Sequence, residues 1–113
     1  MDIKKINDEI DDFVSERDWE KYHKPKNLVM ALSGEVGELN ECFQWLDDED
    51  IENVKNSPEK KVAFEHEIAD VFIYLLRIAN KMNIDLEDVV YKKLELNKLK
   101  YPVETNQGVV NKN

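Results

Sequence analysis

Apolar residues recur at spacings of three and four along most of the chain, and no segment alternates between apolar and polar residues as a half-buried strand would. No Asn-Gly or Asp-Gly pair marks a hairpin turn. The pattern therefore predicts an all-α fold, a bundle of four main helices. We expect these helices at about 3–17, 25–45, 58–82 and 86–100.

Local signals support two of the helix starts. Ser57 is a suitable N-cap, followed by a first-turn proline, Pro58, and by Glu59, whose charge suits the helix dipole. Asp85 is the expected N-cap of the last helix. The acidic segment 47–52 is predicted to be a loop.

The length of 113 residues fits one domain, which we place at 1–102. Residues 103–113 are polar and without periodicity, so we expect a flexible tail or one that lies along a neighbouring subunit. Only three Gly and three Pro occur, which agrees with helices. A chain of this size buries a small core, and oligomerisation is a natural way to enlarge it.

Two acidic residues of the second helix lie where apolar residues are expected. With about 100° of rotation per residue, Glu35 falls inside the apolar stripe and Glu38 lies at its edge, whereas Glu41 points to the other side. An unpaired carboxylate on a core face is unfavourable unless protonation, a basic partner or a metal neutralises it.

The third helix is apolar around most of its circumference, which predicts a buried helix. Its central polar residues fall within an arc of about 80°; they are Glu67, Asp70, Tyr74 and Arg77. If the second and third helices are antiparallel, Glu67 and Asp70 can meet the two acids of the second helix. Oxygen ligands of this kind favour Mg²⁺ or Mn²⁺ over zinc. Arg77 could pair with Asp70, but one arginine cannot balance four acids.

Three small residues, Ser33, Gly34 and Gly37, lie away from the apolar stripe of the second helix. Each glycine costs about 1 kcal/mol relative to alanine inside a helix. We interpret them as a face that another helix approaches closely, such as a subunit interface. The alternative is that the helix merely tolerates both glycines.

The charge balance limits the partners. A net charge of −9 repels a phosphate backbone, so we expect no nucleic acid partner, and a bound nucleotide would come with cations. No apolar run approaches the roughly 20 residues of a membrane span, and no signal-like segment follows Met1. Cys42 is the one cysteine. We therefore expect no membrane association and a reducing, cytoplasmic location.

Several enzyme classes are excluded by missing motifs. His66-Glu67 lacks the second histidine of the zincin pattern, and the chain contains no Gly-x-Ser-x-Gly and no phosphate-binding glycine loop. A di-iron bundle needs Glu-x-x-His on two helices, and only Glu20-x-x-His23 occurs, in a connector.

Several longer motifs are more specific. They are Glu-Arg-Asp-Trp at 16–19, His23, Pro-Lys-Asn-Leu at 25–28, Ala-Leu-Ser-Gly-Glu-Val-Gly-Glu-Leu at 31–39, Phe-Gln-Trp at 43–45, Glu-Ile-Ala-Asp-Val at 67–71, and Asn97 through Tyr101-Pro102. With them the chain closely resembles the MazG-like all-α nucleotide pyrophosphohydrolases, and within that family the small single-domain dCTP pyrophosphatases. The resemblance runs from about Phe13 to Pro102.

The resemblance implies a metal site and a reaction. Mg²⁺, for which Mn²⁺ can substitute, would be held by Glu35, Glu38, Glu67 and Asp70. A nucleoside triphosphate, preferentially dCTP or a modified dCTP, would be hydrolysed to monophosphate and pyrophosphate by water attack at the α-phosphorus. The catalytic candidates are Glu35 and Glu38, and we favour Glu38 as general base because it lies at the edge of the stripe.

The resemblance also implies substrate contacts. Trp19 and His23 match residues that help form the nucleobase pocket, and their flat rings suit stacking on a base. The other matching or neighbouring positions are Lys26, Asn27, Trp45, Tyr74, Asn97, Lys100 and Tyr101.

Ile10 stands where close dCTP pyrophosphatases carry a histidine, which leaves the base preference open. A broad-specificity pyrophosphohydrolase and a non-catalytic acidic helical module that binds a nucleotide or a protein are the alternatives. The family resemblance further implies a homo-oligomer, a tetramer built as a dimer of dimers, whose subunits complete each other's pockets.

Overall fold

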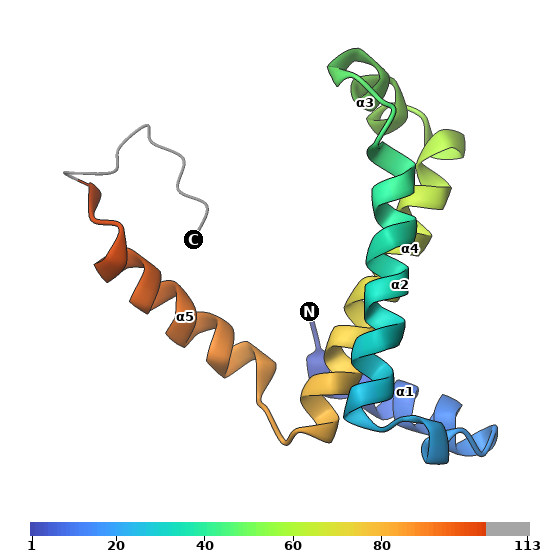
Figure 1. The fold of residues 1–113 in the computed structure, drawn as a ribbon, viewed down its shortest axis with the longest axis vertical. Coiled ribbons are helices and arrows are strands. Elements are labelled where there is room, and N and C mark those ends of the chain that lie inside the picture. The colour runs from blue at the N-terminus through green and yellow to red at the C-terminus, as the bar shows by residue number, and fades with distance from the viewer. Residues whose placement is uncertain (104–113) are drawn as a thin grey trace. The chain divides into compact units, whose positions relative to one another are not determined.

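A computed structural model describes residues 1–103, and this range contains helices and no strand (Figure 1). The predicted all-α fold is confirmed. The elements in chain order are α1 (Ile3–Glu16), the 3₁₀ helix η1 (Glu20–Tyr22), α2 (Pro25–Phe43), α3 (Asp48–Lys55), α4 (Pro58–Lys81) and α5 (Leu86–Lys100).

The predicted helix starts are confirmed at α4 and α5. The Ser57 side chain accepts a hydrogen bond from the backbone N–H of Lys60 over 3.2 Å, with Pro58 in the first turn. The Asp85 side chain accepts a hydrogen bond from the backbone N–H of Asp88 over 3.1 Å. These bonds satisfy backbone donors that the first turn of a helix leaves unpaired.

The acidic segment 47–52 is not a loop, as we predicted, but the start of α3. Asp47 and Asp50 form a capping box, in which each side chain accepts a hydrogen bond from the other residue's backbone N–H. The three acids of the first turn face the positive end of the helix dipole. Clustered acids therefore favour a helix start here.

The chain divides into two compact units, 1–83 and 84–113. In the first unit α2 packs along α4, and α1 and α3 also contact α4. The second unit contains α5. The expected tail 103–113 lies, apart from Val103, outside the described residues.

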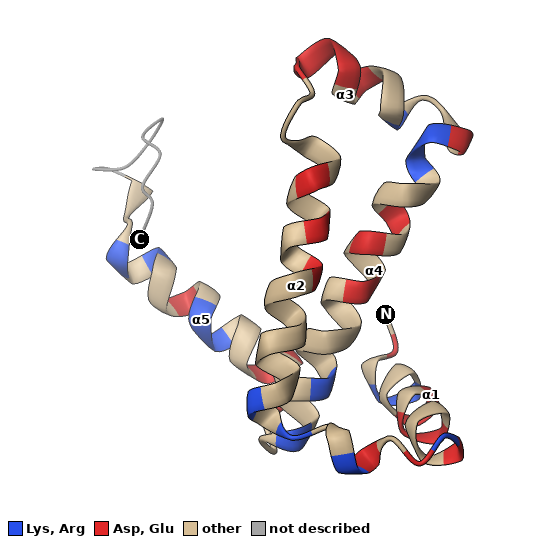
Figure 2. Cartoon of the chain, turned by 45° about the vertical axis from the view of Figure 1, so that its right-hand side comes forward, with Lys and Arg blue, Asp and Glu red and all other residues tan. Residues whose placement is uncertain are grey.

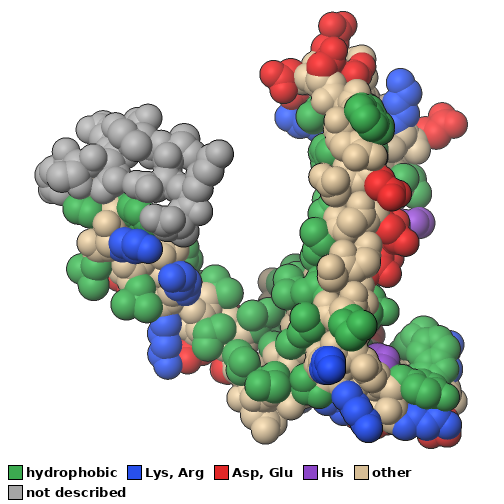
Figure 3. All heavy atoms as spheres, viewed as in Figure 1, with side chains coloured by type: hydrophobic (Ala, Val, Ile, Leu, Met, Phe, Trp, Pro, Cys, Tyr) green, Lys and Arg blue, Asp and Glu red, His purple; other side chains and the backbone are tan. Residues whose placement is uncertain are grey.

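The core of the described chain is small. Its buried hydrophobic side chains are Val14, Leu28, Leu76 and Ala79. We predicted that the helix at 58–82, now α4, is buried. This prediction is wrong for its outer face, since Ile68 is 54% exposed and Leu75 is 42% exposed. Figure 3 shows hydrophobic side chains open on the surface. A single chain has too few other helices to cover α4 on all sides.

In the described part of the chain, no helix combines the length and apolar character that crossing a membrane requires.

Candidate metal and nucleotide site

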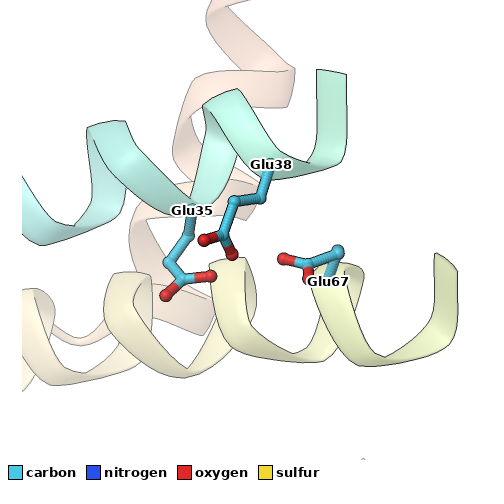
Figure 4. A group of neighbouring side chains, drawn as sticks. All are labelled: Glu35, Glu38 and Glu67. Atoms are coloured by element: carbon cyan, nitrogen blue, oxygen red, sulfur yellow. The ribbon is translucent and has the colours of Figure 1, made fainter. Parts of the chain in front are cut away.

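Three carboxylates meet between α2 and α4. Oxygen atoms of Glu35, Glu38 and Glu67 lie within 4.8 Å of one another (Figure 4). Glu35 and Glu38 come from α2 and Glu67 comes from α4, and Figure 4 shows their carboxylates pointing into the space between the two helices. This is the convergence that helical spacing predicted for three of the four acids.

Helix geometry explains the convergence. Residues three apart lie on the same face of a helix, so Glu35 and Glu38 project together from α2. Figure 2 shows acidic residues along both α2 and α4. Because α2 packs along α4, the acidic stretch of one helix meets that of the other.

The cluster is incompletely neutralised. Glu35 and Glu67 are half-buried, and each has one buried carboxylate oxygen, Oε2, without a hydrogen-bond partner. Among the described residues, no lysine or arginine forms an ion pair with any of the three acids. Buried polar atoms normally have partners. Partnerless oxygens in an all-oxygen cluster fit a hard divalent cation.

The electrostatics agree with that fit. Burial, contact with the Glu38 carboxyl, and the charges of Glu38, Asp70 and Glu67 together raise the pKa of Glu35 to about 7. Burial and the neighbouring Glu38 and Asp70 carboxylates also raise the pKa of Glu67. Both shifts show that a negative charge here is costly without a cation.

Asp70, the fourth predicted ligand, lies outside the group of three carboxylates that approach within 4.8 Å. Its charge still contributes to the raised pKa of Glu35 and of Glu67. Arg77 pairs with Asp11 and Glu20, and no ion pair joins it to Asp70 in the described range. The interpretation of Asp70 as a salt-bridge partner of Arg77 is therefore wrong.

A cavity of about 470 Å³ is lined by Asp70, the acid whose charge also acts on Glu35 and Glu67. Its apolar wall comes from α1 and α4, through Ile6, Ile10, Phe13, Val14 and Ile73. The volume falls within the roughly 300–1,000 Å³ of small-molecule sites. The cavity therefore has room for a nucleoside next to the acidic cluster.

Three predicted substrate residues also line this cavity: Trp19, His23 and Tyr74. The Phe13 and Trp19 rings pack edge to face, with centroids 5.7 Å apart, and Trp19 remains 44% exposed. An aromatic ring held on one side and open on the other suits base stacking.

The other predicted substrate residues do not line the cavity. Lys26 and Asn27 are exposed in the first turn of α2, where the Asn27 side chain donates a hydrogen bond to the Tyr22 carbonyl over 3.4 Å. Trp45 is 85% exposed just beyond α2. Three more belong to the second unit: Asn97, Lys100 and Tyr101.

Our sequence interpretation missed part of the site. Ile6 and Glu9 line the cavity, although no sequence motif assigns them to the site. The sequence places Arg77 on the polar stripe, but the stripe does not predict the hydrogen bonds of Arg77 to α1 and to the 19–23 connector. No local sequence signal indicates these bonds, since Arg77 lies 54 positions from His23.

Comparisons with known proteins agree on one family. The model of the MazG-like family matches residues 30–112. The chain is 42% identical over 107 residues to dCTP pyrophosphatase 1 of Bos taurus, covering 95% of this chain and 62% of that protein. It is 43% identical over 101 residues to dCTP pyrophosphatase 1 of Homo sapiens, and the match covers 89% of this chain and 58% of that protein. The chain thus spans about six tenths of the length of these curated relatives.

A solved structure is also similar. It is a pyrophosphatase from Archaeoglobus fulgidus, with a TM-score of 0.81 and 40% sequence identity. The match covers 90% of this chain and 94% of that one. The similarity therefore extends over nearly the whole described fold.

Proposed function

This chain belongs to the MazG-like family, and from that premise we propose that it is a metal-dependent nucleoside triphosphate pyrophosphohydrolase. It converts a deoxynucleoside triphosphate, preferentially dCTP or a modified dCTP, to the monophosphate and pyrophosphate. The observation that carries this proposal is the position of Asp70, which lines a nucleoside-sized cavity and contributes its charge to the acidic cluster. Base and triphosphate thus have adjoining sites.

The acidic residues hold the cation and accept a proton. Glu35, Glu67 and Asp70 bind the metal, together with Glu38. A divalent cation, Mg²⁺ with Mn²⁺ as a substitute, supplies charge neutralisation of the polyphosphate and a bound water of lowered pKa. Glu38 is the exposed member of the cluster, so we assign it as the acceptor of the proton of the attacking water, beside Glu35. Phosphoryl transfer requires positioning and charge neutralisation, and no covalent nucleophile.

The cavity binds the base. Trp19 stacks on it, while His23 and Tyr74, which also line the cavity, supply polar contacts. Ile10 lines the cavity too, so the substitution of the family histidine acts directly at the base. Six further residues remain predicted substrate contacts, with Lys100 and Tyr101 assigned to the phosphates or the sugar; the other four are Lys26, Asn27, Trp45 and Asn97.

The biological role is removal of unwanted nucleotides from the pool, and a cytoplasmic location stays a prediction. A protein of this activity with broad base specificity is the nearest alternative. The second alternative is a non-catalytic acidic module. Measured turnover of a nucleoside triphosphate would distinguish either enzyme from this module. The net charge of −9 is the argument against a nucleic acid partner.

We also propose that the chain associates with copies of itself into a tetramer made of two dimers. Exposed apolar residues support it on α5, where Leu96 is 60% and Leu99 is 81% exposed, and on α2, where Met30 is 65% exposed. A Cβ atom added at Gly34 or Gly37 would meet nothing within 4 Å in the single chain. The small-residue face of α2 is therefore open for a neighbouring subunit.

The test of the function is product analysis of canonical and base-modified dNTPs and NTPs with Mg²⁺. We expect dCMP and pyrophosphate from dCTP, and no turnover by Glu35→Gln. Equal release from all bases would favour the broad-specificity alternative. No turnover of any triphosphate would favour the binding module.

A further inference from the structure

Among the residues that the structure describes, Arg77 is the one buried charged residue, with 2% exposure. Its guanidinium donates to three side chains. Nη1 bonds the Asp11 carboxylate of α1, Nη2 bonds the Glu20 carboxylate of η1 over 2.6 Å, and Nε bonds Nδ1 of His23 over 3.1 Å. Arg77 thus links α4 to α1 and to the connector that carries the base pocket.

The two carboxylates account for the charge of Arg77. Glu20 also pairs with Lys81, so two cations and two anions balance in this cluster. The Arg77 side chain is buried, whereas those of Asp11 and Glu20 are about half exposed. Removing both carboxylates would therefore leave an uncompensated buried charge on Arg77. The hydrogen bond from Arg77 to His23 is not needed for that charge balance. It affects the protonation of the His23 ring instead.

The bond from Nε fixes where the imidazole carries its hydrogen. An arginine side chain has five N–H donors and no acceptor, so Nδ1 of His23 must accept with its lone pair. In a neutral imidazole the hydrogen then lies on Nε2. A hydrogen on Nδ1 would face the Arg77 N–H directly.

The surroundings also keep the ring neutral. Burial and the charge of Arg77 lower the pKa of His23 below its ordinary value of 6.5. His23 lines the cavity, and in the described part of the chain Nε2 forms no hydrogen bond. The nitrogen that is left for a ligand is therefore a donor.

We propose that Arg77 is a positioning residue that holds His23 as the Nε2–H tautomer, so that the base pocket presents an N–H donor to a hydrogen-bond acceptor on the nucleobase edge. The proposal rests on the proposed function for the identity of the ligand, but not for the tautomer. In this arrangement Arg77 does not touch the substrate. It contributes to base recognition through the histidine.

The direct test is the ¹⁵N NMR spectrum of the full-length labelled protein, with the His23 signals identified by their loss in His23→Gln. We expect a protonated Nε2 and an unprotonated Nδ1 at neutral pH. A spectrum with the hydrogen on Nδ1 overturns the proposal. This readout needs no turnover, so it separates failure of this inference from failure of the proposed function.

Two variants test the role of Arg77. Arg77→Met should give a mixture of both His23 tautomers and raise the His23 pKa, whereas Lys81→Met is the matched control because Lys81 shares Glu20 but not His23. Loss of the tautomer preference in both variants alike would mean that the cluster acts only structurally, and would overturn the proposal. If Arg77→Met does not fold, the ¹⁵N spectra of the wild type and of Arg77→Lys test the proposal instead. A hydrogen on Nδ1 of His23 in the wild type would overturn it.

Steady-state kinetics with dCTP supply an independent test. We expect kcat/KM to fall about tenfold in Arg77→Met and in His23→Ala, as for the loss of one hydrogen bond. The double variant should lose no more than His23→Ala alone. Losses that multiply would show that Arg77 acts independently of His23 and would contradict the proposal.

Discussion

Glu35 on α2 and Glu67 on α4 face one another across the helix pair, and each keeps one buried carboxylate oxygen without a hydrogen-bond partner. Two such oxygens from separate helices are destabilising in a protein without a cation. A divalent cation held by these carboxylates would offset that cost by neutralising their charges. We therefore expect stability and metal binding to be coupled at this site.

Mg²⁺ should raise the melting temperature of the metal-free protein. A ligand that binds only the folded state adds about 2.7 kcal/mol at a hundred times its Kd. Glu35→Gln should melt higher than wild type in EDTA, because it removes one crowded charge, and should respond less to Mg²⁺. The measurement is thermal denaturation by circular dichroism with EDTA or millimolar Mg²⁺.

Glu65→Gln is the control for this experiment, since Glu65 is exposed on the same helix as Glu67 and is not part of the cluster. It should respond to Mg²⁺ like wild type. Identical melting of wild type with and without Mg²⁺ would refute the four-carboxylate site.

The stability of the metal-free protein should depend on pH through Glu35. Its pKa is raised from an ordinary 4.5 to about 7 in the folded state, so the folded state binds this proton more tightly than the unfolded state does. The corresponding stability is fully present below about pH 4.5 and is lost as the pH rises through 7.

Urea denaturation in EDTA between pH 4.5 and 8 measures this effect. The difference in free energy of unfolding between wild type and Glu35→Gln isolates the contribution of Glu35 from that of other acids. A difference that stays constant over the range would show that the Glu35 pKa is not raised.

Glu38→Gln should lose turnover while remaining folded. Removing a general base reduces kcat by about a hundredfold or more. The control is Glu41→Gln, since Glu41 is exposed on α2 outside the cluster and should keep wild-type kcat. Retained kcat in Glu38→Gln would assign the proton acceptor to another group.

Trp19→Ala should weaken substrate binding more than it slows the chemical step. Base stacking on an aromatic ring contributes about 1–3 kcal/mol, so we expect KM for dCTP to rise about tenfold. Tyr22→Ala is the matched control, because Tyr22 is a nearby aromatic residue that does not line the cavity. Equal KM values for the two variants would remove Trp19 from the base site.

Gly37→Leu tests the subunit interface on α2. The single chain has open space at this position, so the helix itself should tolerate the leucine. We expect unchanged helical content and a smaller assembly by sedimentation. An unchanged assembly would mean that this face is not an interface.

The sequence predicts the four longer helices, α1, α2, α4 and α5, and most of the acidic cluster. Helical period alone placed Glu35 on the core side of its helix and Glu67 on a polar stripe, and both predictions agree with the structure. Periodicity failed at 47–52, because a capping box depends on two side chains and not on an apolar pattern.

The rest of the site depends on tertiary packing. The relation of Arg77 to His23 joins residues 54 positions apart, and no local pattern encodes it. The apolar spacing of residues 3–17 predicts a helix, and the structure shows that Ile6 and Ile10 of this helix line a cavity. A hydrophobic stripe has the same spacing whether it contacts protein or ligand.

Hydrolysis of dCTP with Mg²⁺ in H₂¹⁸O, with the products analysed by mass spectrometry, tests whether water attacks the α-phosphorus and releases pyrophosphate. We expect ¹⁸O in dCMP and unlabelled pyrophosphate. Label in pyrophosphate, or release of dCDP and phosphate, would contradict this mechanism.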